Sequence, residues 1–219
     1  MNLINTTLVH KIIPPYKKEG ERSPAVIMLH GRGASEDDLL GLSEYLDERF
    51  FFIAARAPYN FQFGGGYTWY DILEIGKPEP KMFGDSYRRL GEFFEDVKKG
   101  YPIDPSRIFL FGFSMGTIMA FALALTKPGM VRGVIANSGY IPEETDLTFQ
   151  WDKLAGTSFF VAHGIDDPVI PVSYGRRAKI LLDYAKADFI YHEYEMAHQI
   201  TEESLNDIGK WLVKKLNGK

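Results

Sequence analysis

The segment Gly112-Phe113-Ser114-Met115-Gly116 constrains the fold of this chain more than any other stretch of its sequence. An apolar run typical of a buried strand precedes it, and an apolar run typical of a helix follows it. A sharp strand-to-helix turn would strain the backbone of Ser114 and expose its hydroxyl at a helix N-terminus, while the glycines leave room for neighbouring backbone. The segment therefore predicts a nucleophilic serine, with an ordinary glycine turn before a buried helix as the alternative.

Strand-like and helix-like segments alternate along the whole chain. Short apolar runs predict strands at residues 24–30, 50–57, 107–113, 131–137, 157–162 and 188–194, with an additional edge strand at 7–13. Helices are predicted at residues 36–46 (capped by Ser35), from Asp85 or Ser86 to Lys99, from Ser114 to about Lys127, and at 172–185 and 201–216. This alternation predicts one α/β domain over residues 1–219, with a mostly parallel sheet and helices on both faces.

Composition and charge exclude several classes of protein. The net charge of −4 and the lack of a basic stripe argue against a nucleic-acid partner. The chain has no cysteine, which excludes disulfides and a cysteine nucleophile. Met1–Glu21 lacks the apolar core of a signal peptide, and the most apolar stretch, Ile118–Leu125, is too short to span a bilayer. We therefore expect a cytoplasmic protein without a membrane span.

A serine nucleophile needs a base, and the chain offers five histidines. His10 lies far from the carboxyl end of any predicted strand, and His192 lies inside a strand. His30 and His163 each end a strand and precede a glycine. His198 follows the last strand and precedes the last helix, which brings it to the same sheet edge as Ser114. Because triads of this kind run serine, acid, histidine along the chain, His198 is the predicted base.

The acid should lie between serine and histidine, at the end of a strand. Asp166 and Asp167 both follow the strand predicted at 157–162, and spacing alone does not separate them. The acid orients the imidazole and stabilises its positive charge without taking the proton. Either aspartate could do this, and the other would cap the loop.

Two backbone N–H groups are expected to stabilise the oxyanion. The N–H of Met115 directly follows the nucleophile, and the loop His30-Gly31-Arg32-Gly33 follows the first buried strand. Gly31 and Gly33 would let the backbone approach a substrate closely. The loop is not a dinucleotide fingerprint, because Glu36 stands where the third glycine is required. No phosphate-binding loop or metal-ligand cluster is visible in the sequence, so we expect neither a cofactor nor a metal.

The longest irregular segment, residues 58–81, contains six aromatic residues between Tyr59 and Tyr70. Long loops in compact domains are usually functional or disordered, and this aromatic content argues against disorder. One interpretation is an apolar wall for the substrate, with Phe63, Trp69 and Tyr70 as contacts. The other is an Ω-loop packed by its own side chains.

Together these motifs resemble the phospholipase/carboxylesterase family of α/β hydrolases, which includes the acyl-protein thioesterases. The resemblance extends from His30 to His198 and also rests on Ala57-Pro58, Trp69-Tyr70-Asp71 and Asp167-Pro168-Val169-Ile170-Pro171. It implies Ser114 as nucleophile, His198 as base, Asp167 rather than Asp166 as acid, and the N–H groups of Arg32 and Met115 as oxyanion donors. It also implies an α/β-hydrolase fold without a cap domain, and a homodimer as one form of assembly.

We therefore expect a serine esterase that cleaves short- to medium-chain carboxylic acyl esters, small-molecule substrates, through an acyl-enzyme. An acyl thioesterase or a lysophospholipase would use the same triad and differ only in its pocket. A non-catalytic ligand-binding protein on a hydrolase scaffold is the alternative from another class, because a fold does not fix a function.

Overall fold

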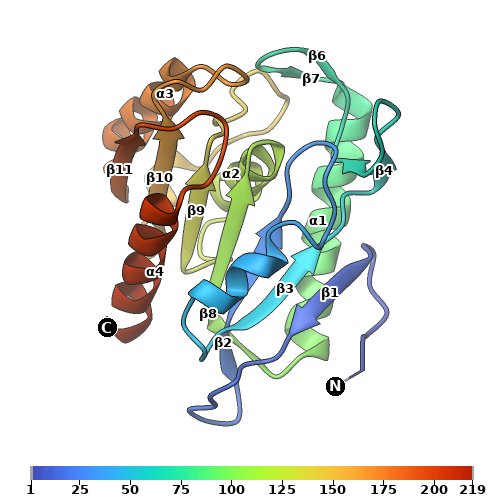
Figure 1. The fold of residues 1–219 in the computed structure, drawn as a ribbon, viewed down its shortest axis with the longest axis vertical. Helices are drawn as coiled ribbons and strands as arrows, with labels where there is room; N and C mark the ends of the chain where they lie inside the picture. Colours follow the sequence, from blue (N-terminus) through green and yellow to red (C-terminus); the bar gives the residue numbers. More distant parts are fainter. Residues whose placement is uncertain (1, 219) are drawn as a thin grey trace.

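The computed structural model describes residues 2–218 and centres on a seven-stranded sheet (Figure 1). In spatial order the strands are β1 (His10–Ile13), β3 (Phe51–Ala55), β2 (Ser23–Leu29), β8 (Ile103–Phe113), β9 (Gly133–Asn137), β10 (Ser158–Gly164) and β11 (Asp188–Tyr194). Only β1 runs antiparallel to its neighbour, β3. The carboxyl ends of the other six strands therefore lie along one edge, where sheets of this type bind ligands.

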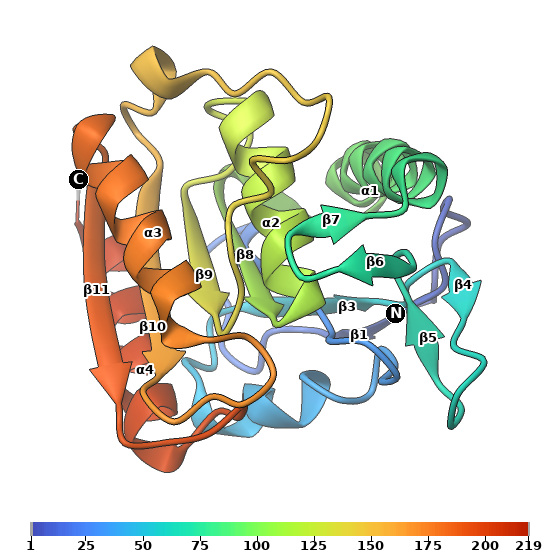
Figure 2. The same ribbon diagram turned by 90° about the horizontal axis from the view of Figure 1, so that it is seen from above.

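Helices cover both faces of the sheet (Figure 2). One face carries α1 (Pro80–Gly100), α2 (Met115–Thr126) and α3 (Val172–Tyr184), and the other carries α4 (Glu202–Asn217) and the 3-10 helix η1 (Leu40–Tyr45). A short 3-10 turn, η2 (Trp151–Lys153), lies in the connection between β9 and β10. The predicted mostly parallel sheet with helices on both faces is confirmed.

The strand sequences explain the two-sided burial. Along β2, Ile27 faces the core under α1, α2 and α3, whereas Val26 and Met28 face the core under α4. The same alternation occurs in β8, where Leu110 faces the first core and Phe109 the second. Because successive side chains point to opposite faces, a strand covered on both sides needs an unbroken apolar run.

Helix α1 begins earlier than the sequence analysis predicts. Pro80 occupies its first position, and the carboxylate of Glu79 accepts the backbone N–H of Met82 at 2.7 Å. Proline suits this position because its missing N–H would have no helical partner there. The residues predicted to cap this helix make different contacts. Asp85 accepts a hydrogen bond from a tyrosine hydroxyl at 2.8 Å, and Ser86 donates to a backbone carbonyl of residues 58–81, which we call the aromatic segment.

The predicted helix at 36–46 is wrong, because only η1 forms there. Residues 36–39 form a turn instead, and the Glu36 side chain is buried against Arg56, with N···O distances of 2.5 and 2.6 Å. Gly41 lies within the segment, and glycine disfavours helix. A contact distant in sequence therefore overrides the local helical pattern.

Helix α2 lies at the centre of the molecule and starts against the end of β2. Eleven of its twelve residues are buried. A Cβ atom at Gly116 would lie 1.9 Å from the carbonyl oxygen of Leu29, so only glycine permits this approach. Although α2 is apolar on all sides, no helix within residues 2–218 is both long enough and apolar enough to cross a membrane.

Substituting Gly116 tests this close approach. We expect Gly116→Ala to lower the free energy of unfolding by at least about 3 kcal/mol, because the added methyl group collides with backbone. Gly84→Ala is the matched control, since a Cβ atom there has open space around it within α1. It should stabilise the protein by about 0.5–1 kcal/mol. Equal midpoints of urea unfolding for the two variants would contradict the account.

Candidate active site

Ser114 lies at the junction of β8 and α2 in a strained conformation. Its φ of 53° and ψ of −118° are sparsely populated by residues other than glycine. Its N–H donates to the carbonyl of Asn137 at 2.9 Å. A Cβ atom at Gly112 would lie 2.5 Å from the backbone of Thr117, so the turn is too tight for a larger residue there. This geometry places the Ser114 hydroxyl at the sheet edge, with the residue 8% exposed.

Three side chains from separate loops meet at this edge. His198, between β11 and α4, lies with Nε2 2.9 Å from Oγ of Ser114. Its Nδ1 lies 2.7 Å from Oδ2 of Asp167, in the loop after β10. Because an ionised carboxylate only accepts hydrogen bonds, the contact places the proton of a neutral His198 on Nδ1. Nε2 is then free to accept the serine hydroxyl and to take its proton.

The structure distinguishes the two candidate acids. The Asp167 side chain is fully buried, and its Oδ1 accepts the N–H groups of Val169 and Ile170 at 2.8 and 2.9 Å. Asp166 is exposed and forms no hydrogen bond to the histidine. Asp167, and not Asp166, therefore contacts His198.

Phe113 packs against the ring of His198. Its ring centroid lies 5.0 Å from that of His198, at an interplanar angle of 45°. A Cβ atom at Gly31 would lie 3.2 Å from the Phe113 ring, so the same ring also packs against the loop after β2. Its place in the sequence, directly before Ser114, does not by itself predict this contact with His198.

The two expected oxyanion donors occupy suitable places. Met115 is the first residue of α2, where N–H groups have no intrahelical partner and carry partial positive charge. Arg32 lies in the turn after β2. Within residues 2–218, neither N–H donates a hydrogen bond to another protein group. Both are available to an oxyanion bound at Ser114.

His30 fixes the orientation of the peptide that carries the Arg32 N–H. Its Nε2 accepts the N–H of Ala57 at 3.0 Å, so its proton lies on Nδ1, which donates to the carbonyl of Gly31 at 2.7 Å. Burial lowers the pKa of His30, which keeps the ring neutral. Because a trans peptide points its C=O and N–H in opposite directions, holding the Gly31 carbonyl aims the Arg32 N–H the other way.

Further contacts brace the same loop against the aromatic segment. This segment forms two hairpins, β4 (Tyr59–Asn60) with β5 (Tyr67–Thr68), and β6 (Ile72–Glu74) with β7 (Lys77–Pro78). Gly33 donates its N–H to the carbonyl of Tyr67 at 2.8 Å. The Arg56 guanidinium holds the pKa of Glu36 below its usual range and donates to the Tyr67 hydroxyl at 3.0 Å.

The aromatic segment divides into buried and exposed parts. Trp69 and Tyr70 have no exposed surface, which corrects the expectation that they contact substrate. Trp69 instead donates its indole N–H to the carbonyl of His30 at 3.0 Å. Phe63 is 78% exposed, and its ring centroid lies 5.9 Å from that of Phe61. The Arg32 guanidinium lies 4.7 Å from the centroid of the Phe61 ring. For Trp69 and Tyr70, the packed-loop interpretation holds.

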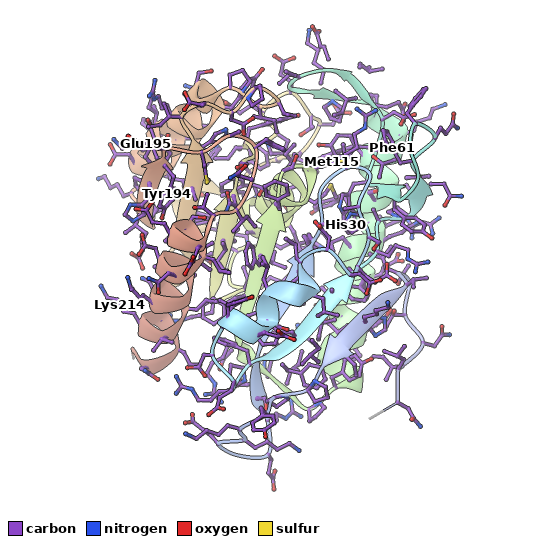
Figure 3. All side chains as sticks on the ribbon, viewed as in Figure 1. His30, Phe61, Met115, Tyr194, Glu195 and Lys214 are labelled. Carbon is purple, nitrogen blue, oxygen red and sulfur yellow. The ribbon has the colours of Figure 1, made fainter. Side chains whose placement is uncertain are left out.

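Surface hollows also occur away from Ser114. One of about 780 Å³ lies beside the first turn of α4 and is lined by Tyr45, Tyr194 and Glu195 among others. In Figure 3, Tyr194 and Glu195 lie at the β11 side, apart from His30, Phe61 and Met115. Within residues 2–218, no group of three or more His, Asp or Glu side chains could hold a metal ion.

Comparison with known proteins identifies the family of this chain. The family described as Phospholipase/Carboxylesterase matches residues 11–216. Acyl-protein thioesterase 1 from Candida albicans is 30% identical over 210 residues, which cover 86% of this chain and 90% of that protein. Lysophospholipase-like protein 1 from Mus musculus is 27% identical over 217 residues, covering 91% and 90%. The Bacillus cereus carboxylesterase structure matches 96% of both chains with a TM-score of 0.85 and 25% identity.

The fold and these likenesses define a hydrolase of the α/β-hydrolase fold. The chain belongs to the phospholipase/carboxylesterase family.

Exchanging the two aspartates tests which one serves His198. Asp167→Asn should lower kcat for an activated ester about 10³–10⁴-fold, because an amide at this position favours the wrong tautomer of the histidine. Asp166→Asn is the control and should stay within about twofold of the wild type, as surface changes usually do. Similar losses in both variants would remove the distinction between the two residues.

Two amide variants separate the contacts of His30. In His30→Asn the amide nitrogen occupies the place of Nδ1 and can still donate to Gly31, whereas Ala57 loses its acceptor. In His30→Gln the amide lies near the place of Nε2, and the Gly31 contact is lost. We expect His30→Gln to lower kcat about 10²-fold, the loss typical of one oxyanion donor, and His30→Asn to lower it far less. Steady-state kinetics that show the opposite order would contradict this role.

Proposed function

We propose that the protein is a serine esterase that hydrolyses short- to medium-chain carboxylic acyl esters through an acyl-enzyme. One observation carries the proposal: Asp167, His198 and Ser114 form a continuous hydrogen-bonded chain, and within residues 2–218 the nearby backbone N–H groups of Arg32 and Met115 donate to no other protein group. A poorly nucleophilic hydroxyl becomes reactive when an oriented base can accept its proton. A ligand-binding protein has no need of this combination, which argues against the non-catalytic alternative.

The proposed reaction proceeds in two halves. Oγ of Ser114 attacks the acyl carbonyl while His198 takes the hydroxyl proton, and a tetrahedral intermediate forms. His198 then gives that proton to the leaving alcohol, and the acyl group stays on Ser114. Water attacks the acyl-enzyme with His198 again as base, which releases the carboxylic acid and restores the serine.

The carbonyl oxygen becomes negatively charged in each tetrahedral intermediate. In this proposal the N–H groups of Arg32 and Met115 bind it, each contributing about 3–4 kcal/mol of transition-state stabilisation. The N-terminus of α2 adds the partial positive charge of its unpaired N–H groups. The tight turn at Ser114 and the hydrogen bond from His30 to the Gly31 carbonyl hold these groups in place before substrate arrives.

The acyl group would meet apolar surface at the same edge. Ile165 and Val169 are 44% and 52% exposed in the loop that carries Asp167, and Phe63 is exposed beyond the oxyanion loop. Such side chains favour an acyl chain without fixing its length. The Bacillus cereus carboxylesterase, which matches almost the whole chain, supports the ester as substrate.

An acyl thioesterase or a lysophospholipase is the second candidate. The named thioesterase and lysophospholipase-like relatives favour it, and the chemistry at Ser114 would be the same. Comparing kcat/KM for an oxygen ester, a thioester and a lysolipid with matched acyl groups separates these candidates. A higher value for the oxygen ester supports the esterase.

Labelling with a fluorophosphonate probe tests the nucleophile. Intact-mass analysis should show one adduct on the wild type and none on Ser114→Ala, since only an activated serine reacts. The same variant should lose about 10⁶-fold in kcat on an activated ester. Retention of most of the activity by Ser114→Ala would falsify the proposed mechanism.

A further inference from the structure

We propose that His163 is a positioning residue for Asp167: its ring N–H holds the acid's loop in the geometry that His198 requires. The inference rests on the proposed function, because it concerns the same acid. It gives a task to a histidine that does not reach Ser114 and that the mechanism above does not use.

His163 lies at the end of β10 and is fully buried. Its Nε2 lies 2.8 Å from the carbonyl oxygen of Ile170. Because a carbonyl only accepts hydrogen bonds, Nε2 carries the proton. Burial lowers the pKa of His163, so the ring is neutral and Nδ1 is unprotonated.

The other side of the ring is closed by α3. A Cβ atom at Gly175 would lie 2.7 Å from Nδ1 of His163, so the glycine is what lets the helix pack on the imidazole. Within residues 2–218, Nδ1 has no hydrogen-bond partner. A buried unpaired acceptor is costly, and an apolar side chain of similar size would avoid that cost. Packing alone therefore does not account for a histidine at this place.

Ile170 connects His163 to the acid. Its carbonyl accepts the His163 N–H, and its own N–H donates to Oδ1 of Asp167 at 2.9 Å. The N–H of Val169 donates to the same oxygen at 2.8 Å. Removing the His163 donor would release the Ile170 carbonyl and loosen the turn that holds Oδ1.

The His163 N–H also acts on the other carboxylate oxygen. Nε2 lies 3.5 Å from Oδ2 of Asp167, the oxygen that receives Nδ1 of His198. The other charged or titratable groups that act on His163 are Glu193 of β11 and His198 itself. His163 therefore lies beside both carboxylate oxygens of Asp167, one reached through Ile170 and the other directly.

A matched pair of variants tests the role of the His163 ring N–H as a hydrogen-bond donor. His163→Gln keeps an amide N–H near the place of Nε2, whereas His163→Met has similar length and no donor. We expect His163→Met to lower kcat on an activated ester about 10–100-fold with little change in KM, because small misplacements of catalytic groups cost up to about 10²-fold. His163→Gln should recover most of that loss.

The pH profile separates positioning from simple destabilisation. In His163→Met the low-pH limb of kcat/KM should move to lower pH, because a loosened Asp167 stabilises the protonated His198 less. In His163→Gln the low-pH limb of kcat/KM should stay at its wild-type position. Val161→Ala, a buried change on the same strand, is the control: it should lower the unfolding temperature and leave the limb in place.

Two results would overturn the role of His163. One is a wild-type kcat and pH limb in His163→Met, and the other is equal impairment of His163→Met and His163→Gln. If His163→Met does not fold, His163→Asn replaces it, since its shorter side chain falls short of the Ile170 carbonyl. Failure of the esterase proposal is distinguishable, because the wild type would then show neither turnover nor a fluorophosphonate adduct.

Discussion

The contact between the start of α2 and the end of β2 is the constraint on which the rest of the site depends. Gly116 lies against the Leu29 carbonyl, where no Cβ atom fits. This approach brings Ser114, the proposed nucleophile, beside the loop that carries Gly31 and Arg32. The strain at Ser114 is a consequence, because a chain leaving β8 must reverse sharply to enter a helix so close to β2.

Three histidines make different contacts in the site. His30 and His163 are buried and neutral, and each uses its ring N–H to hold a backbone carbonyl. His198 is the one that contacts Ser114 and can exchange a proton with it. The two buried rings hold the loops that present Arg32 and Asp167. Each lies at or next to the end of a strand and directly precedes a glycine, which is the sequence signal they share.

Local sequence predicts much of this fold, because strands covered on both faces require unbroken apolar runs such as those of β2 and β8. It fails where distant contacts decide the conformation. Glu36 pairs with Arg56, and η1 replaces the longer predicted helix. The buried Trp69 likewise makes a contact that is distant in sequence, because its indole N–H donates to the carbonyl of His30. For α1, the signal was present locally, since Pro80 after Glu79 is a typical helix start.

In the candidate site, too, local sequence predicts some features and contacts distant in sequence decide others. The Gly-Phe-Ser-Met-Gly segment predicts the strained turn at Ser114, and chain order predicts His198. Asp166 and Asp167 differ in burial. Because the two residues are adjacent in one loop, the sequence does not show which of them is buried. The support given by Phe113 is a packing contact between separate elements, and no spacing rule identifies it.

A crystal structure of the phosphonylated protein tests the central claim most directly, because the adduct imitates the tetrahedral intermediate. The account predicts phosphorus bonded to Oγ of Ser114, with one phosphonyl oxygen about 2.7–3.1 Å from the backbone nitrogens of Arg32 and Met115. His198 should keep its contact with Asp167. A phosphonyl oxygen directed away from both N–H groups, or an adduct on another residue, would contradict the account.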